Sequence, residues 1–233
     1  FKERVEEFAG APIDDRALEA SIDLYNRTRE LVWDLYQLRK SNPPLISGAE
    51  MLEVLIAGGG LPAAELEALL REVKAEVMSR RDGPGAGRAR LLFYGCINDD
   101  VTLIRLVEEC SAHVVMDDTC IGARSFLGRV TNGGDPLAGF VRYYFTGFQC
   151  PRTYRGTDRS RFDYLIHAAR QFQAQGVVLY ILSFCDPHKL DLVDVRRYLE
   201  DAGLPSLVLE DDYTLTNLES MRTRIQAFVE MVA

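Results

Sequence analysis

Four of the five cysteines stand where a parallel β-sheet would place its chemistry. Three of them follow short apolar segments: Cys96 follows residues 90–94, Cys120 follows 113–116 and Cys185 follows 177–184. The fourth, Cys150, lies in a loop over residues 147–151. Short segments rich in Val, Leu, Ile and aromatic residues predict strands. Because the carboxyl ends of parallel strands share one edge, we expect Cys96, Cys120 and Cys185 to lie together, with Cys150 beside them. Thiolates so placed are ligands for a soft metal or an iron–sulfur cluster.

Cys185 has the strongest support as a ligand. Asp186 is a good helix N-cap and Pro187 suits the first helical position, so a helix is expected to begin here with the thiol at its N-terminus. The positive end of the helix dipole favours a thiolate or an anionic cluster. His188 is a further ligand candidate, although a histidine early in a surface helix is more often solvated.

The opposing interpretation is that these cysteines are small buried side chains. Cysteine is among the most buried residue types, and Cys96 or Cys150 taken alone fits that interpretation well. Cys110 lies near the end of an expected helix and is interpreted as a packed residue. No compact Cys-x-x-Cys pair occurs, which excludes zinc-ribbon and ferredoxin patterns.

Other polar groups are less specific. The pairs Asp117-Asp118 and Asp211-Asp212 at strand ends suit either a magnesium site or capping of the following loop, and capping is the commoner arrangement. A basic stretch could meet an anionic substrate or could be a solvated helix entry; its members are Arg152, Arg155, Arg159 and Arg161.

The composition excludes several function classes. Of 233 residues, 35 are Asp or Glu and 27 are Lys or Arg, so the net charge of −8 disfavours nucleic acid as a partner. No apolar run approaches the roughly 18 residues of a membrane span. An odd number of widely spaced cysteines indicates reduced thiols and a cytoplasmic protein. The chain begins with Phe1 rather than Met, so we expect it to be part of a longer protein.

The pattern of elements predicts an α/β fold in three layers. Residues 88–233 are expected to form one domain with a four-stranded parallel sheet of order about 2-1-3-4 between helices. Those helices are expected near 99–111, 136–146, 158–174, 188–202 and 217–231. Residues 1–87 are expected to be an all-helical lead-in with helices near 13–40, 48–57 and 62–79. Asp14 or Asp15 is the expected N-cap of the first of these helices.

An ordered set of motifs extends over most of the chain. It comprises Asp117–Arg124, Asp135-Pro136-Leu137, Cys150-Pro151, Phe184–His188, Leu209–Tyr213 and Arg222–Phe228. In this order the set resembles the superfamily of 2-hydroxyacyl-CoA dehydratase component D and benzoyl-CoA reductase subunits. In that superfamily a subunit has two α/β domains, and this chain resembles the second, with the first apparently absent.

The resemblance implies an anaerobic radical enzyme. Such subunits carry a 4Fe–4S cluster held by three cysteines, of which the third matches Cys185. They reduce an acyl-CoA thioester by one electron to a ketyl, either to dehydrate a 2-hydroxyacyl-CoA (a lyase reaction) or to reduce an aromatic ring (an oxidoreductase reaction). The implied partners are a homologous second subunit in a heterodimer and an ATP-hydrolysing iron–sulfur activator. Arg124 and Arg152 are the candidate substrate contacts, and no catalytic acid or base is assigned.

A second branch of the same superfamily remains open. Double-cubane proteins use more cysteines and hold an eight-iron cluster for reduction or electron transfer. Cys96, Cys120 and Cys150 beside Cys185 could belong to such a set, whereas the segment Phe184–Pro187 looks more like the acyl-CoA branch.

Overall fold

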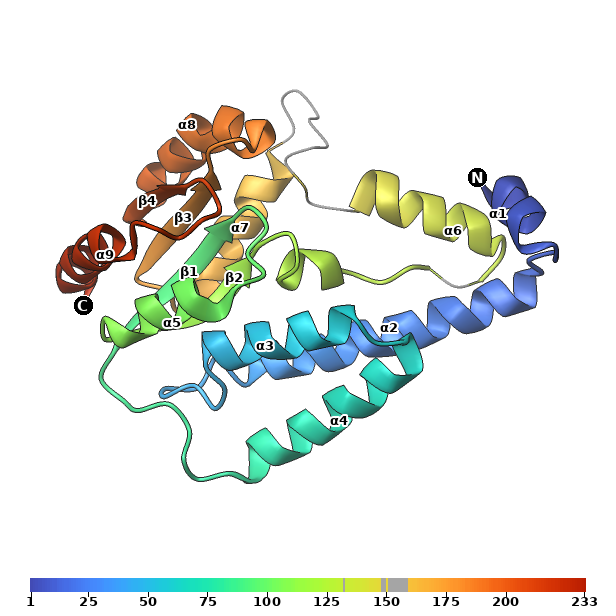
Figure 1. Cartoon of the computed structure of the whole chain (residues 1–233), viewed down its shortest axis with the longest axis horizontal. Coiled ribbons are helices and arrows are strands. Elements are labelled where there is room, and N and C mark those ends of the chain that lie inside the picture. Colours follow the sequence, from blue (N-terminus) through green and yellow to red (C-terminus); the bar gives the residue numbers. More distant parts are fainter. Residues whose placement is uncertain (132, 148–149, 151–158) are drawn as a thin grey trace.

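A four-stranded parallel sheet lies toward one end of the protein and is packed between helices (Figure 1). A computed structural model describes residues 1–131, 133–147, 150 and 159–233. The strand order is β2-β1-β3-β4, which confirms the predicted order 2-1-3-4. The strands are β1 (Ala89–Gly95), β2 (Ala112–Asp118), β3 (Gly176–Leu182) and β4 (Ser206–Asp211). The three apolar segments 90–94, 113–116 and 177–184 correspond to β1, β2 and β3 to within two residues at each end.

Helices cover both faces of the sheet, as expected for strands that are apolar on both sides. Their bounds are α5 (Val101–Glu109), α7 (Ser160–Gln171), α8 (Asp186–Asp201) and α9 (Leu218–Val232). Helices α7 and α8 pack on the face that carries Leu92, Tyr94 and Leu179. Helices α5 and α9 pack on the opposite face, which carries Phe93 and Val178. The three-layer prediction is therefore confirmed.

Of the four helices that precede the sheet, the second, third and fourth share its core, whereas the first has no buried residue. The four helices are α1 (Lys2–Ala9), α2 (Asp15–Gln37), α3 (Gly48–Gly59) and α4 (Ala63–Ser79). Asp14 caps α2 by accepting a hydrogen bond from the Ala17 amide, as one of the two predicted caps. Leu35 and Tyr36 of α2 are fully buried in the same apolar cluster as Leu92 of β1. The boundary between a lead-in and a sheet domain after residue 87 stays a prediction.

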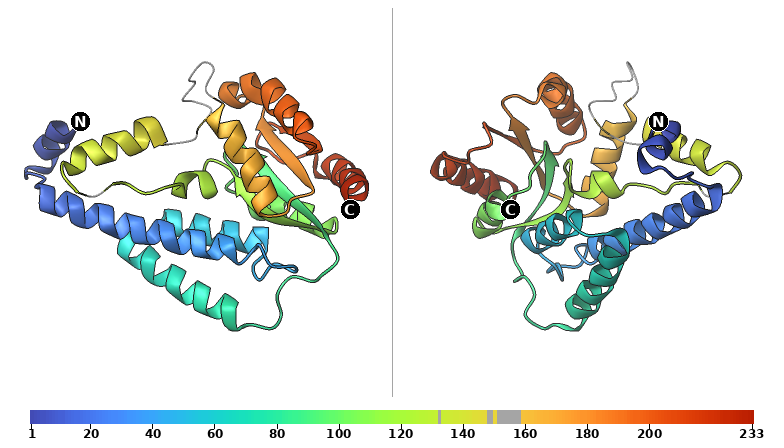
Figure 2. Two further views of the ribbon diagram at one scale, coloured as in Figure 1. Left: turned by 180° about the vertical axis from the view of Figure 1, so that it is seen from behind. Right: turned by 45° about the vertical axis from the view of Figure 1, so that its right-hand side comes forward.

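One end of α2 extends away from the sheet and carries a second, smaller packing region (Figure 2). There α6 (Pro136–Arg142) continues into a π-helical turn over Tyr143–Gly147, close to the predicted helix 136–146. The side chain of Asn26 on α2 forms two hydrogen bonds with the backbone of Val130. Across the described helices of both regions, no segment is long and apolar enough to cross a membrane.

Candidate metal centre

The ends of β1 and β3 bring two cysteines together. Cys96 follows β1 directly, and its amide donates to the carbonyl of Tyr180 in β3 at 3.1 Å. The Leu182 amide, at the end of β3, donates in turn to the Cys96 sulfur at 3.3 Å. This pairing continues the parallel ladder by one residue and places the Cys96 thiol beside the turn that carries Cys185.

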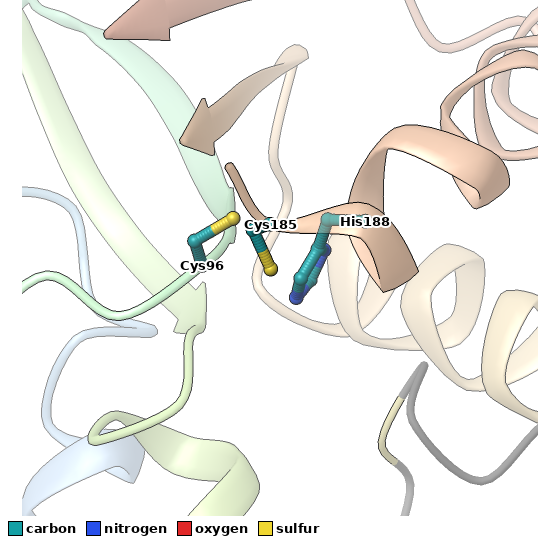
Figure 3. A group of neighbouring side chains, drawn as sticks. All are labelled: Cys96, Cys185 and His188. Atoms are coloured by element: carbon teal, nitrogen blue, oxygen red, sulfur yellow. The ribbon is translucent and has the colours of Figure 1, made fainter. Parts of the chain in front are cut away.

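Cys185 and His188 complete a group of three soft ligand atoms (Figure 3). The sulfurs of Cys96 and Cys185 and one ring nitrogen of His188 all lie within 4.8 Å of one another. Cys96 and His188 are buried and Cys185 is half-buried. Two thiols and an imidazole at this separation are a donor set that zinc or iron favours.

Helix α8 positions both Cys185 and His188. The helix begins at Asp186 with Pro187 in its first turn, so the predicted helix start is confirmed. Cys185 is itself the N-cap residue, one position before the expected cap Asp186. One helical turn then carries His188 back over Cys185, because residues three apart lie on the same helix face. The expectation that His188 is solvated was wrong, since it is only 3% exposed.

Cys120 lies beside this group, in the turn that follows β2. Gly122 makes that turn possible: a Cβ there would lie 1.9 Å from the Asp117 carboxylate. The turn leads into a short 3-10 helix, Ala123–Phe126, which carries Arg124. The Arg124 guanidinium lies 3.8 Å from the Cys120 sulfur and 3.3 Å from Nε2 of His188. Arg124 therefore links the third thiol to the group of Cys96, Cys185 and His188.

Arg124 is buried rather than open to a ligand. It is 1% exposed, and Asp118 accepts hydrogen bonds from its Nε and Nη2. Its Nη1 also donates to the Gly95 carbonyl at 3.3 Å. Every nitrogen of this guanidinium has a protein partner. These contacts hold the positive charge of Arg124 in a fixed position beside the thiols rather than leaving it available to a ligand. A substrate contact by Arg124 stays a prediction that this conformation does not favour.

Burial sets the protonation states of the group. It raises the pKa of Cys96 to about 12 and raises the pKa of Cys120 as well. Burial, with the charges of Arg124 and Arg161, lowers the pKa of His188 to about 3. The metal-free site thus has a neutral imidazole and protonated Cys96 and Cys120 thiols at neutral pH. A metal that binds there must displace the thiol protons.

The remaining candidates fall into three groups. Cys150 is buried, and its charge is one cause of the raised pKa of Cys120, which places it on the Cys120 side of the centre. Cys110 packs in the apolar layer of α5 and α9, as predicted. Arg152 and Arg155 lie outside the described residues.

The paired acids cap loops, as their commoner role predicts. Asp117 accepts hydrogen bonds from the Ala123 amide and from the hydroxyl of Tyr36. Asp211 accepts from the amides of Tyr213 and Leu215. Of the other two acids, Asp212 accepts from the Thr214 amide, whereas Asp118 pairs with Arg124, so three of the four acids cap loops.

Sequence reasoning missed the buried ion pair of Asp118 and Arg124 and the inward position of His188. The spacing of three between Cys185 and His188 was the available signal for the histidine. A turn brings the side chains of Asp118 and Arg124 together. Their six-residue separation is not the side-chain spacing of a helix or a strand, so the sequence carried no signal for this pair.

Taken together, these features define an α/β protein with a soft-ligand centre at the carboxyl edge of its sheet. Comparison with known proteins gives the family. Residues 1–232 match the family "2-hydroxyglutaryl-CoA dehydratase, D-component", and the chain belongs to that family. This confirms the resemblance drawn from the ordered motifs.

Several characterised relatives are similar over almost the whole chain. A benzoyl-CoA reductase subunit of Thauera aromatica is 30% identical, with 100% of this chain and 61% of the relative covered. The lactoyl-CoA dehydratase beta subunit of Anaerotignum propionicum is 27% identical over 99% of this chain and 62% of its own. The (R)-phenyllactyl-CoA dehydratase beta subunit of Clostridium sporogenes is 26% identical over 98% and 60%. The chain thus spans about three fifths of the length of these relatives.

Proposed function

We propose that this chain is part of an iron–sulfur subunit of a radical acyl-CoA enzyme. The enzyme would reduce a CoA thioester by one electron, for 2-hydroxyacyl-CoA dehydration or for reduction of an aromatic ring. The observation that carries this proposal is the convergence of Cys96, Cys185 and His188 within 4.8 Å, in a chain of the dehydratase component D family.

The residues present suit part of a cluster's ligand set. Cys185 is the first candidate ligand, because it is half-buried at the start of α8 and faces the centre. Cys96, Cys120 and Cys150 are the further candidates. An anionic cluster needs compensating charge in a buried place, and Arg124 lies 3.8 Å from the Cys120 sulfur to supply it. When bound, a 4Fe–4S cluster supplies one-electron reduction of the thioester.

The chain's own residues would hold and insulate this site. The buried side chains of Cys96 and His188 exclude water from one wall. Asp118 fixes the orientation of Arg124 by two hydrogen bonds, so the positive charge stays aimed at the thiols. His188 enters the site as a neutral imidazole.

The names of the relatives support the substrate class and the assembly. They are subunits of enzymes named for lactoyl-CoA, phenyllactyl-CoA and benzoyl-CoA. We therefore propose an acyl-CoA substrate, a homologous second subunit in a heterodimer, and an ATP-hydrolysing activator as electron donor. Arg152 remains a proposed substrate contact. Cys96, Cys110, Cys120 and Cys185 are free thiols, which supports a reducing cytoplasmic setting.

A double-cubane reductase or electron-transfer protein is the second candidate. The observation in its favour is that Cys120 and Cys150 accompany Cys96 and Cys185, which is more thiols than a single third ligand requires. An eight-iron cluster would use them.

Iron and acid-labile sulfide counts on anaerobically purified full-length enzyme would test the proposal. We expect about four irons per subunit for the acyl-CoA enzyme and about eight for the double-cubane protein. Absence of iron after anaerobic reconstitution would contradict both and leave a cluster-free subunit.

A further inference from the structure

Five buried polar atoms without a hydrogen-bond partner gather on the sheet face covered by α7 and α8. They are Oη of Tyr94, Nε of Arg161, Oη of Tyr164, Nδ1 of His188 and Oδ2 of Asp191. In the part of the chain that the structure describes, the two other such side-chain atoms, on Arg29 and Arg39, belong to α2 or the turn after it. Five out of seven in one region is a concentration that requires a physical cause.

Contacts and charge interactions connect these residues. Burial raises the pKa of the Tyr164 hydroxyl, which the charges of Asp118 and of Arg124, the neighbour of His188, also affect. The rings of Tyr94 and His188 meet edge to face, with centroids 5.4 Å apart. Arg161 on α7 and Asp191 on α8 form an ion pair of 2.6 Å. Asp191 and Arg161 also lie close enough to Tyr94 to influence the pKa of its hydroxyl, which burial raises. We call this group of five buried side chains the polar compartment.

All five unpartnered atoms can form hydrogen bonds with water. Arg124 always donates, so its contact with Nε2 leaves the proton of the neutral His188 ring on Nδ1. The compartment therefore presents two N–H donors, from His188 and Arg161, and one acceptor, on Asp191. The hydroxyls of Tyr94 and Tyr164 can do both. Buried water typically makes about three hydrogen bonds to such groups.

The polar compartment connects the surface with the candidate metal centre. The side chains of Arg161 and Asp191 are 13% and 11% exposed, so their pair lies at the edge of the interior. At the other end, His188 turns its Nε2 edge toward Arg124 and its ring toward Cys185 (Figure 3). The five residues thus form a polar route through an otherwise apolar layer that includes Leu92, Phe162 and Val195.

We propose that the polar compartment holds a string of ordered water molecules that carries protons between solvent, at Arg161 and Asp191, and the candidate metal centre. This inference rests on the proposed function. Expulsion of the 2-hydroxyl releases hydroxide, which takes up one proton and departs as water. Reduction of an aromatic ring likewise adds protons to carbon along with electrons. Dehydration also releases a proton from the carbon next to the one that carried the hydroxyl, so the route delivers one proton and removes one, and the electron is regained. In ring reduction solvent supplies the protons and the activator supplies the electrons.

A crystal structure of the full-length enzyme with its partner subunit tests the water directly. We expect ordered water within hydrogen-bond distance of at least three of the five atoms. An empty compartment, or direct protein hydrogen bonds that satisfy all five atoms, would overturn the inference. This readout does not depend on the cluster: an enzyme without iron but with this water would contradict the proposed function alone.

Three substitutions in the full-length enzyme test proton transfer: Asp191→Asn, Tyr94→Phe and Tyr164→Phe. We expect Asp191→Asn to lower kcat at least about tenfold and to increase the solvent deuterium isotope effect, with unchanged iron content and EPR spectrum. The tyrosine variants should change both quantities in the same direction by less. Tyr198→Phe is the matched control, because Tyr198 packs against Phe162 in the same layer and is not among the five residues. Wild-type rates and isotope effects in all three variants would overturn the proton role even if the water is present.

Discussion

Arg124 and Asp118 form an ion pair in the interior, with 3.0 Å between Nη2 and Oδ2 and side-chain exposures of 1% and 4%. The pair ties the turn after β2 to the end of that strand. It also holds a guanidinium 3.3 Å from His188 on α8, so one charge connects two of the loops that form the centre. A buried pair of this kind adds little net stability, but removal of one partner leaves an uncompensated charge.

We therefore expect Arg124→Met to lower the free energy of unfolding by about 3–5 kcal/mol, because Asp118 is left charged and buried. The double variant Arg124→Met/Asp118→Leu should recover most of this loss. Denaturant unfolding of the three proteins gives the comparison.

The iron content of the same three proteins distinguishes a role of Arg124 in cluster binding from a role in the stability of the fold. If Arg124 compensates a bound cluster, the double variant should be folded yet deficient in iron. A double variant with full iron content would show that the charge serves the fold alone.

Cys185→Ser should remove cluster absorbance and acyl-CoA turnover together while the fold survives. Serine keeps the volume but supplies a harder, far less acidic ligand. Cys110→Ser is the matched control, since Cys110 packs between α5 and α9. It should cost about 1–2 kcal/mol through a buried hydroxyl and leave the cluster unchanged. Full cluster content in Cys185→Ser would refute its assignment as a ligand.

Single serine variants of Cys96, Cys120 and Cys150 distinguish the two kinds of cluster. For the acyl-CoA enzyme we expect a 4Fe–4S spectrum to survive each replacement, because the other ligands would come from outside this chain. For a double-cubane protein each replacement should destroy the eight-iron cluster. EPR spectra and iron counts of the full-length variants give the answer.

The ion pair of Glu50 and Arg80 predicts a specific dependence of stability on pH. Hydrogen bonds from Arg80 lower the pKa of Glu50 to about 2. Because the pKa of Glu50 is lower in the folded than in the unfolded protein, the ion pair stabilises the fold fully at pH values above the unfolded pKa near 4.5. This contribution is lost as the pH falls from 4.5 toward 2. Because the Glu50 side chain is 40% exposed, we expect only about 1 kcal/mol after solvent screening.

Glu50→Gln should remove that part of the acid sensitivity and lower stability at pH 7 by a similar amount. Glu65→Gln, an exposed substitution in the first turn of α4, serves as control. Parallel curves for wild type and Glu50→Gln between pH 2 and pH 7 would contradict the assignment.

Gly95→Ala should disrupt the edge of the sheet that carries the centre. A Cβ at Gly95 would lie 1.9 Å from the carbonyl oxygen of Tyr180, and this backbone atom cannot rotate away. We expect a loss of at least about 3 kcal/mol, together with displacement of Cys96. Gly59→Ala, at the end of α3 with no heavy atom within 4 Å, should be neutral or slightly stabilising. Thermal unfolding of both variants is the measurement, and equal stabilities would contradict this account.

Local patterns were sufficient for the framework of the fold. Apolar runs of β-branched and aromatic residues located the strands, because a strand that is buried on both faces consists of a continuous run of apolar residues. Capping residues located the starts of α2 and α8 to within a residue. The placement of Cys96, Cys120 and Cys185 followed from one rule of parallel sheets, namely that their carboxyl ends share an edge.

Periodicity and the handedness of crossovers were therefore enough to predict the fold class, the strand order and the grouping of the cysteines. The packing of separate elements, in contrast, decided that Arg124 lies inside with Asp118 and that His188 faces the thiols. It also decided that polar atoms of α7, α8 and β1 meet in one compartment. In these arrangements side chains from separate elements meet, and burial sets their charge states. Neither the spacing nor the types of the residues therefore predict the arrangements.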